Sequence, residues 1–236
     1  MQENYFKFYS PSLGFETDLL TFGTSGIPII LFPTSMGRYY QNKDFKLIDT
    51  VEDKINEGKI KIYCPDSIDE QSWYNKLIHP ADRVKNHLKY DSYIINELVP
   101  RVLEETGKDK VIYAGCSFGA YHATNFGYKY PHLTSHILNM GGAFNIKMHM
   151  KGYYDDNVYF NNPPDYIPNL KDDNIHNIKI VFGVGQNDFC LLDNQAMSEI
   201  LTEKNIDHWL DIRPNKDHDW PVWREMFPEY VNQIVG

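Results

Sequence analysis

Short apolar segments alternate with helical patterns along most of the chain, and this alternation restricts the possible folds more than any other feature. Runs rich in β-branched and aromatic residues predict strands at residues 5–9, 15–22, 27–32, 60–64, 111–114, 135–140, 178–184 and 209–212. Helical patterns lie between most of these runs, at residues 44–56, 82–105 with an interruption at Pro100, 120–130 and 194–204, and in a last helix through Ile234. The pattern is typical of an α/β protein with a mostly parallel central sheet of about eight strands and helices on both faces.

The length and residue balance favour a single folded domain over residues 1–236. A chain of 236 residues with 42% hydrophobic and 14% aromatic residues can bury a sizeable core. A proline and a glycine in residues 11–14 predict a turn that joins the first two strands into a hairpin. Parallel sheets bind ligands beyond the carboxyl ends of their strands, so we expect the functional residues in the loops at that edge.

Residues 144–177 depart from the alternation. The segment has prolines, asparagines and little periodicity, and its aromatic residues include Tyr153, Tyr154, Tyr159, Phe160 and Tyr166. Long irregular connections in compact domains are mostly functional or disordered, and the aromatic content favours packing. We predict a lid-like insert over the functional site, in which Tyr159 and Phe160 line an apolar substrate pocket.

Charge and cysteine usage argue against several classes of partner. The net charge of −9 comes without a lysine and arginine cluster, so we expect neither a nucleic acid nor a membrane surface as partner. No run approaches the roughly 18 apolar residues of a membrane span, and the N-terminus lacks a signal-peptide pattern. Cys64, Cys116 and Cys190 are odd in number and lack metal-type spacing. We therefore expect a cytoplasmic protein with no metal or other cofactor, and the oligomeric state stays open.

The pentapeptide Gly115-Cys116-Ser117-Phe118-Gly119 lies between a predicted strand and a predicted helix. In this context a G-x-S-x-G pattern indicates a tight turn that strains the serine backbone, and the glycines leave room for the turn. The amino end of the following helix directs free N–H groups at an oxyanion. We predict that Ser117 is a nucleophile and that Cys116 is buried packing.

A serine hydroxyl needs a base to take its proton, and the base needs an acid that holds the right tautomer. Asp188 and His218 follow the predicted strands at 178–184 and 209–212, in the order serine, acid, histidine. Because both loops belong to the edge that carries Ser117, we predict Asp188 as the orienting acid and His218 as the base.

Other acids and histidines are weaker candidates. Asp193 opens a predicted helix and fits an N-cap, and Asp217 and Asp219 adjoin His218 in the same loop, where neighbours rarely face each other. His122 lies inside the helix that follows Ser117, so we expect it to face solvent or pack locally. The remaining histidines lie within predicted elements or at their starts.

An oxyanion hole in such a site combines the N–H of the residue after the nucleophile with an N–H from the loop after an earlier strand. The first donor is Phe118. The second comes from the loop at residues 33–38, where Thr34 and Ser35 are both candidates and the sequence does not separate them.

Several of these segments together resemble the esterase branch of the α/β-hydrolases. They are Gly115 to Gly119, Gly141-Gly142, residues 183–188 and His218-Asp219-Trp220-Pro221-Val222-Trp223-Arg224. The branch includes esterase D-like proteins, feruloyl esterases, enterochelin esterase-like proteins and mycolyltransferases, and the resemblance covers nearly the whole chain. It implies an α/β-hydrolase fold and supports His218 as the base. Residues 67–83 also resemble a family loop beside the active site, which makes Trp73 a substrate-pocket candidate.

The predicted function is that of a serine esterase, which cleaves a small-molecule ester through an acyl-enzyme intermediate. Two alternatives remain open. In an acyltransferase of the same fold, an alcohol would take the acyl group in place of water. A non-catalytic scaffold used for binding would be marked by the loss of a catalytic residue, and all three candidates are present.

Overall fold

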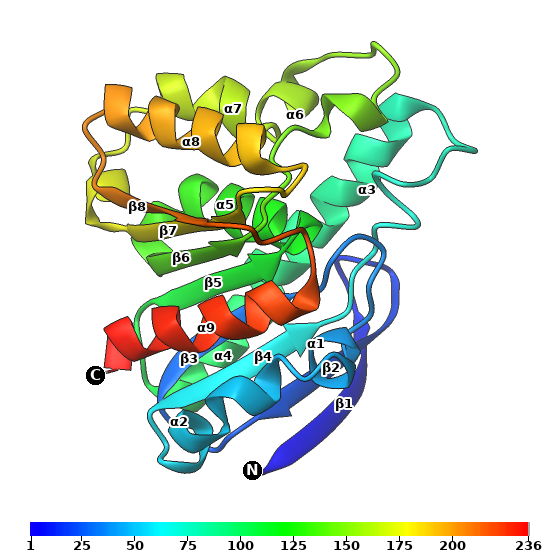
Figure 1. The fold of residues 1–236 in the computed structure, drawn as a ribbon. Helices are drawn as coiled ribbons and strands as arrows, with labels where there is room; N and C mark the ends of the chain where they lie inside the picture. Colours follow the sequence, from blue (N-terminus) through cyan, green and yellow to red (C-terminus); the bar gives the residue numbers. More distant parts are fainter. Residues whose placement is uncertain (236) are drawn as a thin grey trace.

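An eight-stranded sheet forms the centre of the molecule (Figure 1). The computed structural model describes residues 1–235. The strands are β1 (Glu3–Ser10), β2 (Phe15–Phe22), β3 (Ile27–Phe32), β4 (Ile60–Pro65), β5 (Val111–Cys116), β6 (Thr134–Met140), β7 (Lys179–Gly185) and β8 (His208–Arg213). Their order is β1-β2-β4-β3-β5-β6-β7-β8. The hairpin of β1 and β2 and the β2–β4 pair are antiparallel, and all other pairs are parallel. The mostly parallel sheet predicted from the sequence is confirmed.

Helices cover both faces of the sheet. They are α1 (Gln41–Asp44), α2 (Glu52–Asn56), α3 (Pro80–Tyr93), α4 (Val99–Thr106), α5 (Phe118–Lys129), α6 (Asp156–Tyr159), α7 (Pro163–Tyr166), α8 (Leu191–Glu203) and α9 (Trp220–Val235). Figure 1 shows α9 crossing one face of the sheet while α5 lies on the other. In the described part of the chain, no helix combines the length and the apolar character needed to cross a bilayer.

Successive residues of the central strands pack into two different cores. On β3, Ile30 and Phe32 join the cluster that includes residues of α3, α4, α5 and α8, whereas Ile29 and Leu31 join the cluster that includes residues of α2 and α9. This follows from the period of two along a strand, and burial on both faces explains why β3 is an almost continuous apolar run.

The long helix predicted at residues 82–105 continues past Pro100 instead of breaking there. A π-helical turn at Ile94–Leu98 connects α3 to α4, and Pro100 lies in the first turn of α4. Proline lacks the N–H group that an α-helix interior requires. A local change of hydrogen-bond register next to Pro100 keeps the chain helical.

Residues 144–177 divide into two parts. The first part, which includes a 3₁₀ turn at Ile146–His149, lies at the carboxyl edge of the sheet beside the start of α5. The second part contains α6 and α7 and packs on the helix layer, where α7 contacts both α5 and α8 and α6 contacts α3. The first part of the insert therefore borders the functional edge, and α6 adds Val158 to the buried cluster that contains Phe118.

Candidate active site

Ser117 occupies a sharp turn between β5 and α5. Its φ of 54° and ψ of −120° lie in a region that is strained for any residue with a side chain. The flanking glycines make this turn possible. A Cβ on Gly119 would lie 2.6 Å from the Pro33 carbonyl oxygen and 2.8 Å from that of Phe32, and a Cβ on Gly115 would overlap the backbone of Gly119. The turn predicted from the sequence is present, and α5, the helix that follows it, packs directly on the end of β3.

His218 lies between Ser117 and Asp188. Its Nε2 is 3.0 Å from Ser117 Oγ, and its Nδ1 is 2.8 Å from Asp188 Oδ1. Because a carboxylate can only accept hydrogen bonds, Nδ1 carries the ring proton, and its N–H group donates a hydrogen bond to Asp188. Nε2 is then free to accept the proton of the Ser117 hydroxyl. The Asp188 side chain is 1% exposed and the His218 side chain 12% exposed, so the charged end of the chain of hydrogen bonds is shielded from water.

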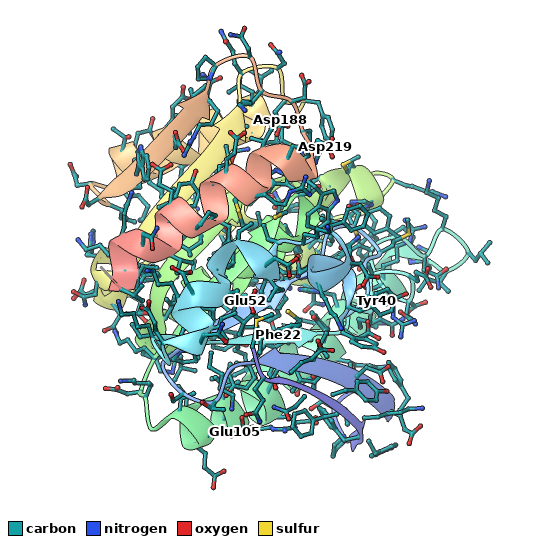
Figure 2. All side chains as sticks on the ribbon, turned by 60° about the horizontal axis from the view of Figure 1, so that its bottom comes forward. Phe22, Tyr40, Glu52, Glu105, Asp188 and Asp219 are labelled. Atoms are coloured by element: carbon teal, nitrogen blue, oxygen red, sulfur yellow. The ribbon has the colours of Figure 1, made fainter. Side chains whose placement is uncertain are left out.

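Two loops that follow neighbouring strands bring these groups together. Two backbone hydrogen bonds of 2.8 and 2.9 Å join the loops, from the N–H groups of Gln186 and Asn187 to the carbonyl groups of Arg213 and Lys216. Figure 2 shows Asp188 and Asp219 near the amino-terminal end of α9. The carboxyl edge of the parallel sheet is thus where the predicted serine, acid and histidine meet.

Gly141 leaves the space that the acid and the histidine fill. It follows β6 with a φ of 60°, and a Cβ there would lie 2.9 Å from Asp188 Oδ2 and 3.1 Å from His218 Nδ1. Gly141 and Gly142 are part of the resemblance to the esterase branch, and this crowding explains why the first of the two positions requires a glycine.

Aromatic residues hold the His218 ring. Phe189 lies 4.1 Å from it between ring centroids, and the Trp223 ring meets it edge-on at 5.0 Å. Trp223 is buried, whereas Phe189 is 78% exposed. The imidazole therefore contacts one buried ring, which belongs to the core, and one large apolar ring that is exposed to solvent.

The weaker candidates have other roles. Of the two expectations for His122, local packing is the one observed: its side chain is 2% exposed, and its Nε2 lies 3.1 Å from the buried Asp69 Oδ1. Asp193 lies in the first turn of α8, but Cys190 precedes the helix as the N-cap residue, so the predicted N-cap is wrong by a few positions. Asp219 accepts a hydrogen bond of 2.7 Å from the backbone N–H of Trp220 at the start of α9.

A second serine and histidine pair occurs in the described chain. Ser198 Oγ lies 2.6 Å from His208 Nε2, but His208 Nδ1 faces the backbone oxygen of Ile206 at 2.9 Å instead of a carboxylate. Ser198 lies within α8 and does not occupy a strained turn. The pair lacks both the acid and the turn that distinguish Ser117.

The loop after β3 presents one free amide among its central residues. The Thr34 N–H donates to Gln41 Oε1 at 2.8 Å, and the Met36 N–H donates to Asp69 Oδ2 at 3.0 Å. Ser35 lies between them, and its N–H has no acceptor among residues 1–235. Of the two oxyanion candidates that the sequence left open, Ser35 is the one whose donor is available.

Phe118 is the first residue of α5, where N–H groups have no partner within the helix. Its ring lies edge-on to Tyr74 at 5.3 Å and to His149 at 5.6 Å. The Tyr74 hydroxyl donates to Ser35 Oγ at 2.7 Å. Burial lowers the pKa of His149 to about 4, so this ring is neutral near pH 7. Tyr74 and His149 therefore form an uncharged aromatic wall beside both candidate oxyanion donors.

The pocket residues predicted from the sequence lie elsewhere. Trp73 has no exposed surface and packs against His87 at 4.7 Å, so the prediction that it contacts a substrate is not supported. Tyr159 packs against the helix-side core, and Phe160 is 56% exposed beside a hollow lined by Lys129 and Tyr130. The aromatic content of the insert indicated packing correctly, but it could not show which side chains reach Ser117.

Asp188, Cys190 and His218 are close enough together to resemble a metal site. Two of these residues already bond to each other: Asp188 Oδ1 accepts a hydrogen bond from His218 Nδ1 at 2.8 Å, and it also accepts one from the Cys190 backbone N–H at 2.7 Å. Burial raises the pKa of the Cys190 thiol well above its usual range, which disfavours the thiolate that binds metals. The chemistry of this group fits an oriented histidine better than a metal centre.

Comparisons with known proteins identify the family and the fold of the chain. The family model described as "Putative esterase" matches residues 27–234. No curated protein matched the sequence. A ferulic acid esterase structure has a TM-score of 0.80 at 15% identity and covers 100% of this chain and 98% of its own. An S-formylglutathione hydrolase from Agrobacterium tumefaciens has a TM-score of 0.80 at 11% identity and covers 99% and 95%. MPT51 of Mycobacterium tuberculosis has a TM-score of 0.75 at 13% identity and covers 100% and 98%. These likenesses show the fold, which is the predicted α/β-hydrolase fold.

Proposed function

The chain belongs to the esterase family matched by its residues 27–234 and is a carboxylic ester hydrolase, and we propose that it works through Ser117, His218 and Asp188. The observation that carries the proposal is the continuous contact from Ser117 Oγ through His218 to Asp188, at 3.0 and 2.8 Å. These are the distances at which a base can remove a hydroxyl proton and an acid can hold the base.

In the proposed cycle His218 Nε2 takes the hydroxyl proton as Ser117 Oγ attacks the ester carbonyl carbon. The resulting imidazolium, stabilised by Asp188, gives the proton to the leaving alcohol oxygen when the tetrahedral intermediate collapses. Water then attacks the acyl-enzyme with His218 again as base, which releases the carboxylic acid and restores Ser117. The backbone N–H groups of Phe118 and Ser35 hold the oxyanion in both steps.

This cycle assigns the two parts of the ester to different sides of the site. His218 protonates the leaving oxygen, so the alcohol part must lie near the imidazole, where Phe189 is exposed at 4.1 Å from the ring. The carbonyl oxygen points to the N–H of Phe118, so the acyl part lies toward Tyr74 and His149. Both sides are aromatic, and we propose a small ester with a flat, apolar acyl group as substrate.

The activity test compares Ser117→Ala with Ser198→Ala. Turnover of a nitrophenyl ester panel that includes acetyl, butyryl and feruloyl esters should fall on the order of a million-fold in kcat in Ser117→Ala. Ser198→Ala removes the hydroxyl of the second serine and histidine pair and should keep wild-type turnover. Labelling by a fluorophosphonate should be lost only in Ser117→Ala. Substantial activity in folded Ser117→Ala would remove Ser117 from the mechanism.

The same assay, with product analysis, separates hydrolysis from acyl transfer. We expect the free acid as the product even when a sugar or a simple alcohol is added as acceptor. A dominant transesterified product would instead assign the protein to the acyltransferases of this fold.

The three cysteines are unpaired and buried, which supports the proposal that the protein works in a reducing compartment such as the cytoplasm.

A further inference from the structure

The loop that carries Ser35 has a strained backbone. Met36, the next residue, has a φ of 54° although it is not glycine. Such a conformation is strained for a residue with a side chain and persists only where the surroundings hold it in place. The strain lies directly beside the proposed second oxyanion donor, so the contacts that hold this loop determine where the Ser35 N–H points.

Two side-chain oxygens hold the amides on either side of Ser35. Gln41 Oε1 accepts the Thr34 N–H at 2.8 Å and also lies 3.1 Å from Thr34 Oγ1. Asp69 Oδ2 accepts the Met36 N–H at 3.0 Å. These two acceptors, Gln41 Oε1 and Asp69 Oδ2, are called the amide clamp below. They occupy the neighbouring donors and leave the Ser35 N–H as the free one.

Asp69 is itself fixed to the helix that follows the nucleophile. Its side chain is 1% exposed, and its Oδ1 lies 3.1 Å from Nε2 of His122, which is 2% exposed and belongs to α5. A buried carboxylate is unfavourable unless it is hydrogen-bonded and paired. Asp69 meets this requirement by joining the loop after β3 to α5, the helix that begins with Phe118, the first proposed donor. One side chain therefore links the backbones that carry both donors.

We propose that Gln41 and Asp69 are positioning residues for the oxyanion hole, which hold the Ser35 N–H at a fixed place relative to Phe118 and Ser117. This proposal rests on the proposed esterase function. The amide clamp does not touch the substrate. It acts by keeping a donor preorganised for the charge that develops in the transition state, and a displacement of about 1 Å in such a group can cost about 100-fold in rate.

Paired substitutions on both sides of the clamp test this proposal. Asp69→Ala and Gln41→Leu remove the acceptors, and each should lower kcat by about 10- to 100-fold with KM nearly unchanged. Asp69→Asn and Gln41→Glu keep an oxygen at the same place and should restore kcat to within about threefold of wild type. Because Asp69→Ala also leaves His122 without its partner, Gln41→Leu, in the half-buried start of α1, provides the test if Asp69→Ala does not fold.

An inhibitor pair gives a readout that a purely structural role would not change. A trifluoromethyl ketone forms a bond between its carbonyl carbon and Ser117 Oγ, with the serine proton passing to His218 and an oxyanion left in the hole. Its affinity should fall by the same factor as kcat in Asp69→Ala and Gln41→Leu, whereas the affinity of the matching secondary alcohol should not change. The control is Asp91→Ala, which removes another buried carboxylate, paired with Lys129 away from this loop, and should lower the melting temperature but not kcat.

The proposal is overturned if folded Asp69→Ala and Gln41→Leu both keep kcat within about threefold of wild type, a change too small for a misplaced oxyanion donor. It is also overturned if the ketone and the alcohol lose affinity equally, or if Asp69→Asn and Gln41→Glu are as impaired as the variants without an acceptor. A wild-type protein without esterase activity would instead overturn the proposed function. An active wild type with unaffected clamp variants would overturn the clamp alone.

Discussion

Asp188 and Asp193 are five positions apart, yet their surroundings at the residue scale differ sharply. Asp188 Oδ1 accepts hydrogen bonds from His218 Nδ1 and from a backbone N–H, while its Oδ2 is buried with no partner in the described part of the chain. Asp193 lies in the first turn of α8, where burial raises its pKa, and it forms no ion pair with a histidine among residues 1–235. Only the first environment can fix a histidine tautomer.

We expect Asp188→Asn to keep the fold and to lower kcat by up to about four orders of magnitude, because an amide N–H facing Nδ1 stabilises the wrong imidazole tautomer. Asp193→Asn should change kcat only slightly. Steady-state kinetics of both variants, with circular dichroism as a check of folding, provide the measurement. If Asp193→Asn were the impaired variant, the acid would have been assigned to the wrong residue.

The two proposed substrate sides make separate predictions for His149 and Phe189. His149 has a pKa of about 4, so it is neutral near pH 7 and acts there as an aromatic surface. His149→Ala should change the preference among acyl groups by about 1–3 kcal/mol in kcat/KM while the order of alcohols stays the same. Phe189→Ala should change the preference among alcohols while the order of acyl groups stays the same. His149→Phe should preserve the acyl preference.

The measurement is a matrix of esters that varies the acyl and the alcohol parts independently. Leu192→Ala is a suitable control, since Leu192 is likewise a large exposed apolar residue, 76% exposed in the first turn of α8, but carries no aromatic ring. If Phe189→Ala and His149→Ala shifted the same part of the ester, the assignment of sides would be incorrect.

At the scale of elements, the contact between α5 and the end of β3 sets the position of Ser117. A methyl group on Gly119 would meet backbone oxygens of β3 and its following residue, at 2.8 and 2.6 Å, and backbone cannot move aside as a side chain can. For a methyl group on Gly127, two turns later in the same helix, the nearest atoms would be side-chain atoms of Ile137 and Thr134.

Gly119→Ala should therefore push α5 away from β3, displace the serine and lower kcat by about 100-fold, together with a lower melting temperature. Gly127→Ala should lower the melting temperature with kcat close to wild type, because Ile137 can repack. Kinetics and thermal unfolding of the two variants test this difference. Equal loss of kcat in both would mean that general loosening of α5 accounts for the effect.

At the scale of the whole molecule, Glu105 of α4 joins this helix to β4 through hydrogen bonds from Lys61 and Tyr63. Figure 2 shows it well away from Asp188. Burial would raise the pKa of Glu105, but hydrogen bonds from Lys61, Arg101 and Tyr63 outweigh it and lower the pKa from 4.5 to about 2. Because the pKa is lower in the folded state, ionised Glu105 stabilises the fold above pH 4.5, and this contribution is lost as the pH falls toward 2.

Glu105→Gln should lower the free energy of unfolding near pH 7, and its deficit relative to wild type should shrink as the pH falls below 4.5. Urea unfolding across this range provides the measurement. Glu104→Gln is the control, since the neighbouring Glu104 has no ion pair among the described residues and its replacement should change the free energy of unfolding little. A constant deficit for Glu105→Gln would contradict the lowered pKa.

Local patterns in the sequence were sufficient to predict the strands, the sheet class and the positions of Ser117, Asp188 and His218 at one edge. Each of those predictions depends on neighbours along the chain: a period of two marks a strand, a G-x-S-x-G turn follows it, and a loop residue after a parallel strand must lie at the carboxyl edge. The helix predicted at residues 120–130 begins slightly earlier in the structure, at Phe118.

The surroundings of the site depend on contacts between segments far apart in the sequence, so only the tertiary structure decided them. Asp69 reaches Met36 across 33 residues, and nothing near either residue indicates that contact. Trp73 and Tyr74 are neighbours in an unpatterned loop, and only the packing of that loop against α5 buried the first and left the second beside Ser35. The choice of Ser35 over Thr34 likewise depended on which amide Gln41 had already bonded. Sequence periodicity determines which edge a residue occupies, whereas burial and partners depend on how the loops meet in space.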